Sequence, residues 1–433
     1  PLAERSVNTA NVCQRHVLRV RVKPVLGQQT KSMPLNGPVL ILGNNEVANS
    51  FATRLQAEGH EATSLPTDHP EELIGRLDSL WQRGPISHLF LLTAFDSVPD
   101  LTLEQTQWNT RRRRGVLAPY FLTQRWMELV QSHELLASSS FIACSVLGGN
   151  FGLADTVWRV ESGAMSGLAK ALNVEFGQRQ QDVFLSKVID FSASHSSEQV
   201  VDWIAREVSA RTPEVEVGYN DQNERVVIHA HSEPHVVKSE SDETDLQQAT
   251  HQAKTSNTTI SPAGTWLISG GARGVTAEVA KQVALQFPVK LHLLGSSPPP
   301  DIDPAWTKHT EEQRQTLKKE VCAAAARRGD RPLAAWTRVE KAIEIAANLD
   351  DFANRGIHAV YHQCDVSDRS SLASVLESIR RTDGSINGVI HGAGFERSCR
   401  FSKKKPAEVD LTLSAKVDGA AALMELTADD SLQ

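Results

Sequence analysis

The sequence predicts two tandem α/β units, each built on a doubly wound parallel sheet. Short, continuous apolar runs alternate with amphipathic segments in both halves of the chain, a pattern typical of parallel strands whose faces are both covered by helices. A polar stretch rich in Ser, Thr, Asp, Glu and Gln separates the two halves. The chain has 433 residues, which is enough for two or three domains of roughly 150 residues.

The polar stretch sets the predicted domain boundaries. Residues 232–262 contain almost no large apolar side chains, so they cannot bury enough surface to offset the entropy of ordering, and we expect a linker. A solvated helix over 244–254 is the alternative. The linker divides the chain into a first unit, 1–231, and a second unit, 263–433.

The first unit contains a regular series of expected elements. Residues 15–22 alternate between polar and apolar side chains and predict a half-buried strand. We expect a helix over 46–58, and further strands over 39–43, 88–92, 140–144 and 185–189.

The second unit repeats the pattern but contains an insertion. We expect a helix over 276–286 and strands over 266–269, 291–294, 359–362 and 388–390. Between the second and third of these strands lies an insertion at about 297–357, with two expected helices at about 311–328 and 336–354. The insertion is either a packed helical decoration or a contact surface for a neighbouring domain.

Composition and charge exclude several classes of function. The net charge of −7 argues against a nucleic-acid partner, which needs a basic surplus. No apolar run reaches the roughly 18 residues of a membrane span. No histidine spacing indicates a metal site. The five cysteines are scattered without CxxC spacing, which is typical of reduced thiols in a cytoplasmic protein. The chain begins at Pro1 and ends soon after an expected helix, so we expect it to be part of a longer protein.

A glycine-rich turn in the second unit is the strongest local motif. Residues 269–276 read Ser-Gly-Gly-Ala-Arg-Gly-Val-Thr and lie between an expected strand and an expected helix, the context that a dinucleotide-binding turn requires. Gly270 permits the sharp turn, and Gly274 lets the backbone approach a pyrophosphate at the helix N-terminus. A tight strand–helix turn without a ligand remains the alternative on this motif alone.

Residues after the later strands favour a phosphorylated nicotinamide cofactor. Asp365 follows one strand, where an acid can meet the adenine amino group, and a His-Gly-Ala-Gly run at 391–394 follows the next. After Gly295 come Ser296 and Ser297, where an acid would hold the ribose hydroxyls of NAD. The missing acid, together with Arg273, favours the 2′-phosphate of NADP.

This set of motifs resembles the short-chain dehydrogenase/reductase family. It is most similar to the ketoreductase domains of polyketide synthases and polyunsaturated-fatty-acid synthases, in which a degenerate Rossmann-like copy precedes the active one. The resemblance also rests on the Lys-Val-Asp-Gly run at 416–419. It implies NADPH as cofactor and Lys416 as a catalytic residue, although a solvated helix lysine is the alternative for Lys416. It departs at Ser296, where such domains usually carry arginine. The residues expected to bind the cofactor are Gly270, Gly271, Ala272, Arg273, Gly274, Val275, Ser296, Asp365, Val366, Gly392, Ala393 and Gly394.

The first unit is interpreted as a degenerate, structural copy. Ser145 begins the frame in which the family carries Ser, Tyr and Lys, but Trp158 replaces the tyrosine and Ser162 the lysine. The phenol must protonate the forming alkoxide and the lysine must lower its pKa, so this copy cannot catalyse the reaction. Its turn is also altered, because Val47 stands where the second glycine should be.

The same frame predicts what the second unit needs. If Arg112 corresponds to Lys416, because each precedes a glycine by three residues, the catalytic serine and tyrosine fall near positions 449 and 462. They would then lie beyond residue 433, and we expect this chain to be inactive alone.

Three functions are consistent with these motifs. The first is NADPH-dependent reduction of a β-ketoacyl thioester, held on an acyl carrier protein beside neighbouring synthase domains, to the β-hydroxyacyl product. The second is a short-chain reductase or epimerase that acts on a free small molecule. The third is a non-catalytic scaffold of a megasynthase.

Overall fold

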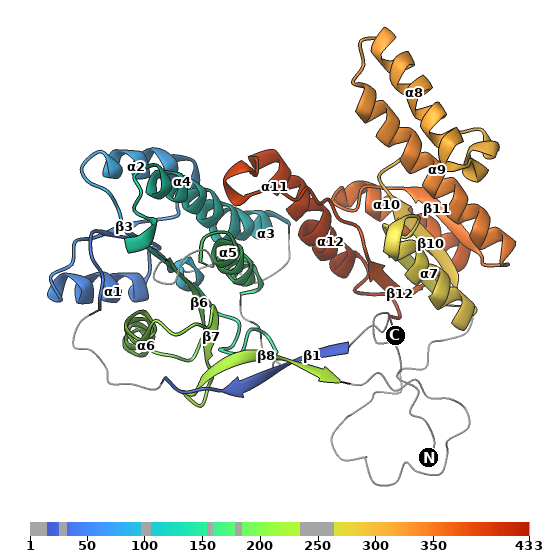
Figure 1. The fold of residues 1–433 in the computed structure, drawn as a ribbon. Helices are drawn as coiled ribbons and strands as arrows, with labels where there is room; N and C mark the ends of the chain where they lie inside the picture. The colour runs from blue at the N-terminus through green and yellow to red at the C-terminus, as the bar shows by residue number, and fades with distance from the viewer. Residues whose placement is uncertain are drawn as a thin grey trace, which may run out of the picture. The chain divides into compact units, whose positions relative to one another are not determined.

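The computed structural model describes residues 15–25, 33–96, 105–153, 157, 159–177, 184–233 and 264–432. The chain divides into two compact units, residues 1–249 with 399–404 and residues 250–398 with 405–433. Each unit has its own sheet with helices packed on it (Figure 1). The predicted α/β class with two sheets is therefore confirmed. The predicted linker lies outside the described residues except for its first two positions, which end a strand.

The first unit is built on an eight-stranded sheet of order β1-β8-β7-β6-β5-β4-β2-β3. Neighbouring strands from β3 to β7 are parallel, whereas β8 pairs antiparallel with both β7 and β1. The sequence did not predict this antiparallel extension. The strands are β1 (Arg15–Val22), β2 (Val39–Leu42), β3 (Ala62–Leu65), β4 (His88–Leu91), β5 (Ser140–Ser145), β6 (Leu185–Phe191), β7 (Glu216–Tyr219) and β8 (Arg225–Glu233).

Helices cover both faces of this sheet because adjacent residues of each strand point to opposite sides. Val39 and Ile41 pack with α1 and α6, while Leu40 and Leu42 pack with α2, α4 and α5. The helices are α1 (Glu46–Ala57), α2 (Leu73–Trp81), α3 (Gln105–Arg112), α4 (Ala118–Ser132), α5 (Ala164–Leu172) and α6 (Ser197–Ala210). π-Helical turns follow α3 (Arg113–Leu117) and α5 (Asn173–Gly177).

Strand β1 forms at the predicted residues but is not half-buried. Leu18, Val20 and Val22 are 54%, 39% and 48% exposed. The strand is the outermost of the sheet and pairs only on one side, with β8. The prediction of a half-buried strand was therefore wrong, because alternation alone does not show whether anything covers the apolar face.

A short segment from the second half of the sequence belongs to the first unit. In residues 399–404, Phe401 is 6% exposed and packs against the ring of Tyr120 at a centroid distance of 5.1 Å. Gln124 donates hydrogen bonds to the carbonyls of Phe401 (2.7 Å) and Lys404 (2.9 Å). The Phe401 amide donates to Glu175 at 2.8 Å. Phe401 therefore belongs to the hydrophobic core of the first unit, although it follows the predicted linker in the sequence.

The second unit has a four-stranded parallel sheet of order β11-β10-β9-β12. Its strands are β9 (Thr265–Ser269), β10 (Lys290–Gly295), β11 (Ala359–Gln363) and β12 (Ile386–His391). Its helices are α7 (Gly274–Gln286), α8 (Glu311–Arg327), α9 (Pro332–Asn354), α10 (Arg369–Asp383), α11 (Pro406–Leu413) and α12 (Gly419–Leu426). A π-helical turn (Ser414–Asp418) joins the last two helices.

The two faces of this sheet again bury alternate residues. Ile268 and Leu293 pack with α7 and α9 on one face, and Leu267 and Leu294 pack with α10 and α12 on the other. Each strand of the interior is thus buried on both sides, as the continuous apolar runs predict.

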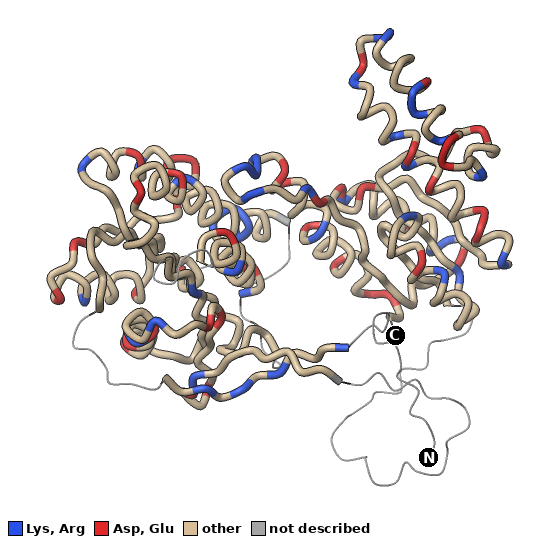
Figure 2. The backbone as a smooth tube through the Cα atoms, in the orientation of Figure 1, with Lys and Arg blue, Asp and Glu red and all other residues tan. Residues whose placement is uncertain are grey.

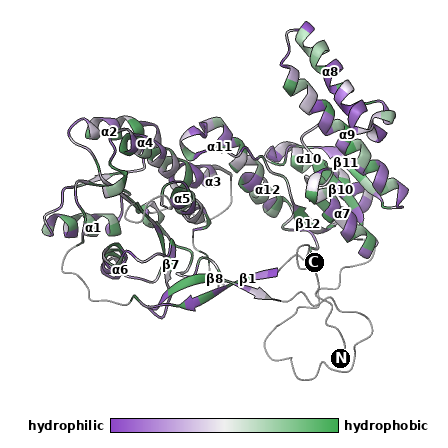
Figure 3. Cartoon of the chain, viewed as in Figure 1, coloured by the Kyte–Doolittle hydropathy of each residue, from purple (hydrophilic) through white to green (hydrophobic). Residues whose placement is uncertain are grey.

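The predicted insertion forms two helices that differ in their packing. The second, α9, buries Ile345 and Phe352 against the strands of the second unit. The first, α8, packs with α9 through a small separate cluster that contains Leu317 and Trp336. Acidic and basic residues alternate along this pair of helices (Figure 2), and many residues of α8 are hydrophilic (Figure 3).

The described residues contain neither a candidate membrane-spanning helix nor a candidate metal site. No helix within them has both the length and the apolar composition needed to cross a bilayer. Nor do they contain three or more His, Cys, Asp or Glu side chains grouped so that they could hold a metal ion.

Candidate functional site

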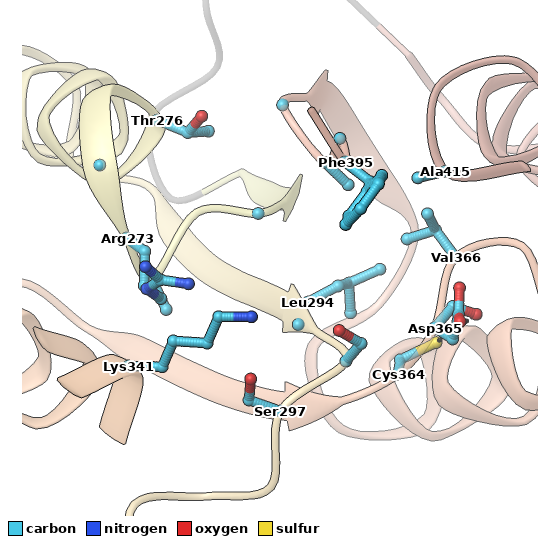
Figure 4. A pocket seen from close by; sticks show the side chains of 18 of the residues that line it. Arg273, Thr276, Leu294, Ser297, Lys341, Cys364, Asp365, Val366, Phe395 and Ala415 are labelled. Carbon is cyan, nitrogen blue, oxygen red and sulfur yellow. Dashed lines mark hydrogen bonds between the residues drawn. The ribbon is translucent and has the colours of Figure 1, made fainter. Parts of the chain in front are cut away.

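A cavity of about 490 Å³ lies at the carboxyl ends of the strands of the second unit (Figure 4). The segments that follow β9, β10, β11 and β12 all contribute to its wall. Ligands of open parallel sheets bind at this edge, because the loops there converge on one crevice.

The glycine-rich turn forms one side of the cavity. Gly270 has φ +71° and Gly274 has φ +57°, both in the left-handed region that favours glycine. A Cβ at Gly270 would lie 2.9 Å from the carbonyl oxygen of Gly392, so the turn and the end of β12 approach closely only because no side chain intervenes. At Gly274 the space is open and α7 begins, which directs the first amide groups of the helix toward the cavity.

A carboxylate from the insertion reaches this turn. Glu344, on α9, accepts hydrogen bonds from the Gly274 amide at 2.8 Å and from Nε of Arg273 at 2.7 Å. Asn348, one turn further along α9, donates to the carbonyl of Ala272 at 3.0 Å. The insertion helix is therefore part of the site wall.

The end of β10 is held by a tyrosine of the edge strand. Tyr361 donates a hydrogen bond to the carbonyl of Ser297 at 2.7 Å. Burial raises the pKa of the Tyr361 phenol above its usual value, so the hydroxyl stays protonated at neutral pH and engaged with the backbone. Gly295 accepts from the amide of Cys364 at 2.8 Å, which joins this end of β10 to the segment after β11.

Asp365 and Val366 lie across the cavity from Arg273 (Figure 4). One oxygen of Asp365 accepts from the amide (3.0 Å) and hydroxyl (2.7 Å) of Ser367, and these bonds fix the carboxylate at the rim. Val366 is 4% exposed and anchors the same loop in the core.

His391 at the end of β12 connects the turn to the π-helical turn. Its Nε2 lies 3.0 Å from the carbonyl oxygen of Lys416, and its Nδ1 lies 2.7 Å from the hydroxyl of Ser269. A carbonyl can only accept, so Nε2 carries the proton and Nδ1 accepts from Ser269. Ser269 in turn accepts from the amide of Ala393 at 3.2 Å. This chain of hydrogen bonds fixes the backbone of Lys416 beside the glycines of β12.

The side chain of Lys416 lies along Gly394. A Cβ at Gly394 would come within 2.8 Å of Lys416 Cε, so glycine there leaves room for the lysine. The side chain is exposed, and it is the neighbouring Ala415 and Ser414 that line the cavity.

The structure brings together most of the residues singled out in the sequence. Two of them, Gly271 and Lys416, do not line the cavity. Those that do are Gly270, Ala272, Arg273, Gly274, Val275, Ser296, Asp365, Val366, Gly392, Ala393 and Gly394.

Sequence reasoning missed the contribution of the insertion. Lys341, Glu344 and Ile345 of α9 line the cavity, as do Tyr361 and Phe395. Nothing local marks the α9 residues, which lie about 70 positions after the turn that they meet.

In the first unit, side chains of the chain itself fill the corresponding turn. The carboxylate of Asp96 accepts from the Asn44 amide (2.8 Å), from the side-chain amide of Asn45 (2.7 Å) and from the hydroxyl of Thr67 (2.8 Å). Asn45 also caps α1 by accepting from the Ala48 amide at 2.9 Å. A cavity at the neighbouring strand ends measures only about 40 Å³, too small for a nucleotide.

Ser145 and Ser162, the two serines that fall in the Ser-Tyr-Lys frame, are hydrogen-bonded within the first unit. The hydroxyl of Ser145 donates to Asp190 at 2.7 Å, and that of Ser162 donates to the carbonyl of Arg159 at 2.7 Å. Both serines are buried. Trp158 lies outside the described residues, so its position is not assigned.

The helices of the two units indicate a different alignment from the one that pairs Arg112 with Lys416 in the sequence. In each unit an eight-residue helix, α3 or α11, leads into a five-residue π-helical turn. The third residue of that turn is Gly115 in one unit and Lys416 in the other. The pairing of Arg112 with Lys416 was therefore wrong by three residues, because matching glycines were used in place of the helix geometry. The first unit has no side chain at the lysine position, and the projected serine and tyrosine positions move three residues earlier.

Comparison with known protein families decides the assignment of the second unit, because residues 264–433 match the KR domain family. This segment, less than half of the chain, is therefore similar to a KR domain, and the second unit is named the KR domain after that similarity. The relatives of the chain are polyketide synthases. Polyketide synthase PksL of Bacillus subtilis (strain 168) is 36% identical over 74 residues, which are 17% of this chain and 2% of that protein. Phenolphthiocerol synthesis polyketide synthase type I Pks15/1 of Mycobacterium marinum is 37% identical over 105 residues, 24% of this chain and 4% of that protein.

Solved ketoreductase structures share the fold of both units. An N-terminal ketoreductase from the macrolactin assembly line has 16% sequence identity and a TM-score of 0.62, and the match covers 97% of this chain and 73% of that one. A-type ketoreductases from a modular polyketide synthase have 15% identity and a TM-score of 0.59, with 96% and 72% covered. The similarity in fold therefore extends over both units of the chain. The matched segments span 4% or less of the two synthases named above.

Proposed function

We propose that the protein is the ketoreductase region of a multidomain polyketide or fatty acid synthase. In this proposal the KR domain binds NADPH and reduces a β-ketoacyl thioester, carried by an acyl carrier protein, to the β-hydroxyacyl product. The observation that carries the proposal is the cavity at the strand ends, which the left-handed glycine turn and the N-terminus of α7 border.

The residues of the cavity fit a dinucleotide. The amides at the start of α7 and the open space at Gly274 suit a pyrophosphate. Asp365 is at the rim where it can accept a hydrogen bond from an adenine amino group. Gly392, Ala393 and Gly394 offer backbone with little side-chain bulk beside the position that a nicotinamide ring would take.

NADPH supplies the hydride when it is bound. The chain's own residues bind and orient: the turn holds phosphate, and His391 fixes the backbone of Lys416. We assign the Lys416 ammonium to the nicotinamide ribose and to the proton donor, whose pKa a nearby cation lowers.

That proton donor is not one of the three tyrosines of this sequence. Tyr120 and Tyr219 belong to the first unit, and the hydroxyl of Tyr361 is engaged with Ser297. None of the three has lysine four residues later, as the reductase frame requires. We therefore expect turnover only from a chain that also carries the Ser and Tyr of that frame.

The proposed partners follow from the relatives. Polyketide synthases are the proteins to which this chain is similar, so we propose neighbouring synthase domains and an acyl carrier protein as its partners. We also propose a cytoplasmic location, which the free thiols of Cys144, Cys322, Cys364 and Cys399 support.

A charge introduced at the turn tests the cofactor assignment in the 433-residue chain. Gly274→Asp suits this position because Asp tolerates the left-handed region and a Cβ there meets nothing. Its carboxylate would repel a pyrophosphate. Gly274→Asn has the same shape without the charge and is the matched control.

We expect the parent chain to enhance NADPH fluorescence on titration. Gly274→Asp should weaken binding by roughly tenfold or more, and Gly274→Asn should weaken it much less. Absence of NADPH binding in a correctly folded parent would overturn the proposal and favour a scaffold role. Equal binding by the parent and Gly274→Asp would place the nucleotide elsewhere.

A further inference from the structure

The middle of helix α9 forms part of the wall of the KR-domain cavity. Ile345 is 1% exposed and packs in the core with β9, β10 and α7. Asp351 on the same helix forms an ion pair with Lys281 of α7 at 3.2 Å. These contacts hold the backbone of α9 in place beside the cavity.

Two cations and two carboxylates line this cavity: Arg273, Lys341, Glu344 and Asp365. Glu344 pairs with Arg273 at 2.7 Å, so the charge of Arg273 is partly neutralised. Asp365 lies on the opposite side (Figure 4). Lys341 has no hydrogen-bond or ion-pair partner within the part of the chain that the structure describes. Its ammonium is therefore a cation of the wall that no described carboxylate neutralises at ion-pair distance.

Lys341 extends toward the end of β10. Figure 4 shows its side chain crossing from α9 toward Leu294, with Arg273 on one side and Ser297 on the other. Ser296 and Ser297 also line the cavity at this end. A cation beside two hydroxyl-bearing residues is suited to a phosphate monoester, which accepts charge-assisted hydrogen bonds.

We propose that Lys341 binds the 2′-phosphate of NADPH, together with Ser296 and Ser297, and so makes the insertion the determinant of cofactor choice. The proposal rests on the assignment of NADPH above. The strand end of β10 carries neither an acid for free ribose hydroxyls nor an arginine, so a cation supplied by α9 takes that role.

Binding of paired nucleotides by the 433-residue chain tests the proposal. NADPH and NADH differ only in the 2′-phosphate, as do the competitors 2′,5′-ADP and 5′-AMP. We expect Lys341→Ala to weaken NADPH and 2′,5′-ADP by roughly tenfold, the order of one charge-assisted contact. NADH and 5′-AMP should change by less than about twofold. Lys341→Arg should retain most of the NADPH affinity, because it keeps the charge.

Lys319→Ala is the matched control, because Lys319 is an exposed lysine of α8 that does not line the cavity. It should leave all four affinities unchanged. Equal weakening of NADPH and NADH by Lys341→Ala, or no effect on either, overturns the role of Lys341 while the proposed function stands. A folded parent that binds neither NADPH nor NADH overturns the proposed function and this inference with it.

Discussion

Glu344 contacts the glycine-rich turn of the KR domain by accepting hydrogen bonds from both the Gly274 amide (2.8 Å) and the Arg273 side chain (2.7 Å). A carboxylate here satisfies the same donors that a phosphate would use. In the first unit Asp96 does the same for Asn44. The two internal carboxylates differ in origin, since Asp96 ends the short 3-10 helical turn after β4 whereas Glu344 comes from the insertion.

We therefore predict that Glu344→Gln tightens NADPH binding. A pyrophosphate must displace Glu344 from the Gly274 amide and then lie near its negative charge, and the neutral amide removes that repulsion. Affinity measured by fluorescence titration should rise severalfold, in line with one partly exposed charge interaction. Glu340→Gln, an exposed site one turn earlier on α9, should leave the affinity unchanged. Weaker binding by Glu344→Gln would mean that Glu344 organises the turn for the ligand.

A second prediction is that each chain binds one NADPH. The second unit offers a cavity of about 490 Å³, and the comparable cavity of the first unit is about 40 Å³. Isothermal titration of the 433-residue chain should give one site, and Gly274→Asp should weaken binding at that site by roughly tenfold or more. Two sites of similar affinity would contradict the view that Asp96 and Asn45 close the first turn.

The sequence predicted the local features of the site better than the tertiary ones. The glycine turn and the ends of β10, β11 and β12 are each marked by a motif of a few adjacent residues. Arg273 and Asp365 could therefore be placed at the same edge of the sheet, where its strands end. Glu344 and Lys341 could not be placed there. They lie about 70 residues after the turn in the sequence and reach the cavity only through the packing of α9. The alignment of Arg112 with Lys416 failed because the matched glycines occupy different places: Gly115 lies within its π-helical turn, whereas Gly419 begins α12.

Acid is predicted to destabilise both units. Burial is the main reason that the pKa values of His88 in the first unit and His292 in the second fall to about 4, and His362 adds to the effect at His292. The unfolded chain takes up these protons near pH 6.5, whereas the folded chain does so only near pH 4. Stability is therefore complete above pH 6.5 and is lost as the pH falls toward 4, by at most about 1.4 kcal/mol per pH unit for each histidine.

Urea unfolding between pH 7.5 and 4.5 measures this dependence. Asp383 lies 3.5 Å from His292 and partly offsets the effect, since it favours the charged form. His292→Gln should reduce the slope of the free energy of unfolding against pH. His69→Gln, at an exposed position, should leave the slope as it is. An identical slope in the His292 variant and the parent would exclude His292 as a source of acid sensitivity.

A buried ion cluster is predicted to stabilise the first unit. The carboxylate of Glu207 is fully buried and accepts from Lys187 at 2.8 Å, from Tyr219 at 3.0 Å and from Arg225. Burial disfavours the carboxylate, but hydrogen bonds and charge from Arg225 and Lys187 outweigh burial and hold the pKa of Glu207 below its usual value. Glu207→Gln leaves the buried Lys187 without its ion-pair partner and leaves Arg225 paired with Glu214 alone. It should lower the free energy of unfolding by about 3–5 kcal/mol.

Thermal unfolding followed by circular dichroism measures that loss. Glu198→Gln on the same helix, α6, is exposed and should change stability by less than about 0.5 kcal/mol. A small effect of Glu207→Gln would show that water or a rearranged side chain replaces the lost charge.

The last prediction concerns Lys416 and needs a longer synthase chain that carries the expected serine and tyrosine. The side chain of Lys416 lies against Gly394, and His391 holds its backbone carbonyl at 3.0 Å. In that chain Lys416→Met should keep the fold and most of the NADPH affinity while reducing turnover by roughly 10²–10⁴, the range of a general-acid contribution. Lys416→Arg should restore only part of the rate, because a planar guanidinium does not reproduce a compact ammonium. Lys319→Met removes a charge from an exposed position of α8 and should leave turnover unchanged.

The assay for these variants is NADPH oxidation with a β-ketoacyl thioester, measured across a range of pH. Loss of the lysine should also shift the pH profile of turnover, since the phenol would lose the cation that lowers its pKa. Turnover and pH profile equal to the parent in Lys416→Met would make Lys416 a surface lysine and remove the π-helical turn from the active site.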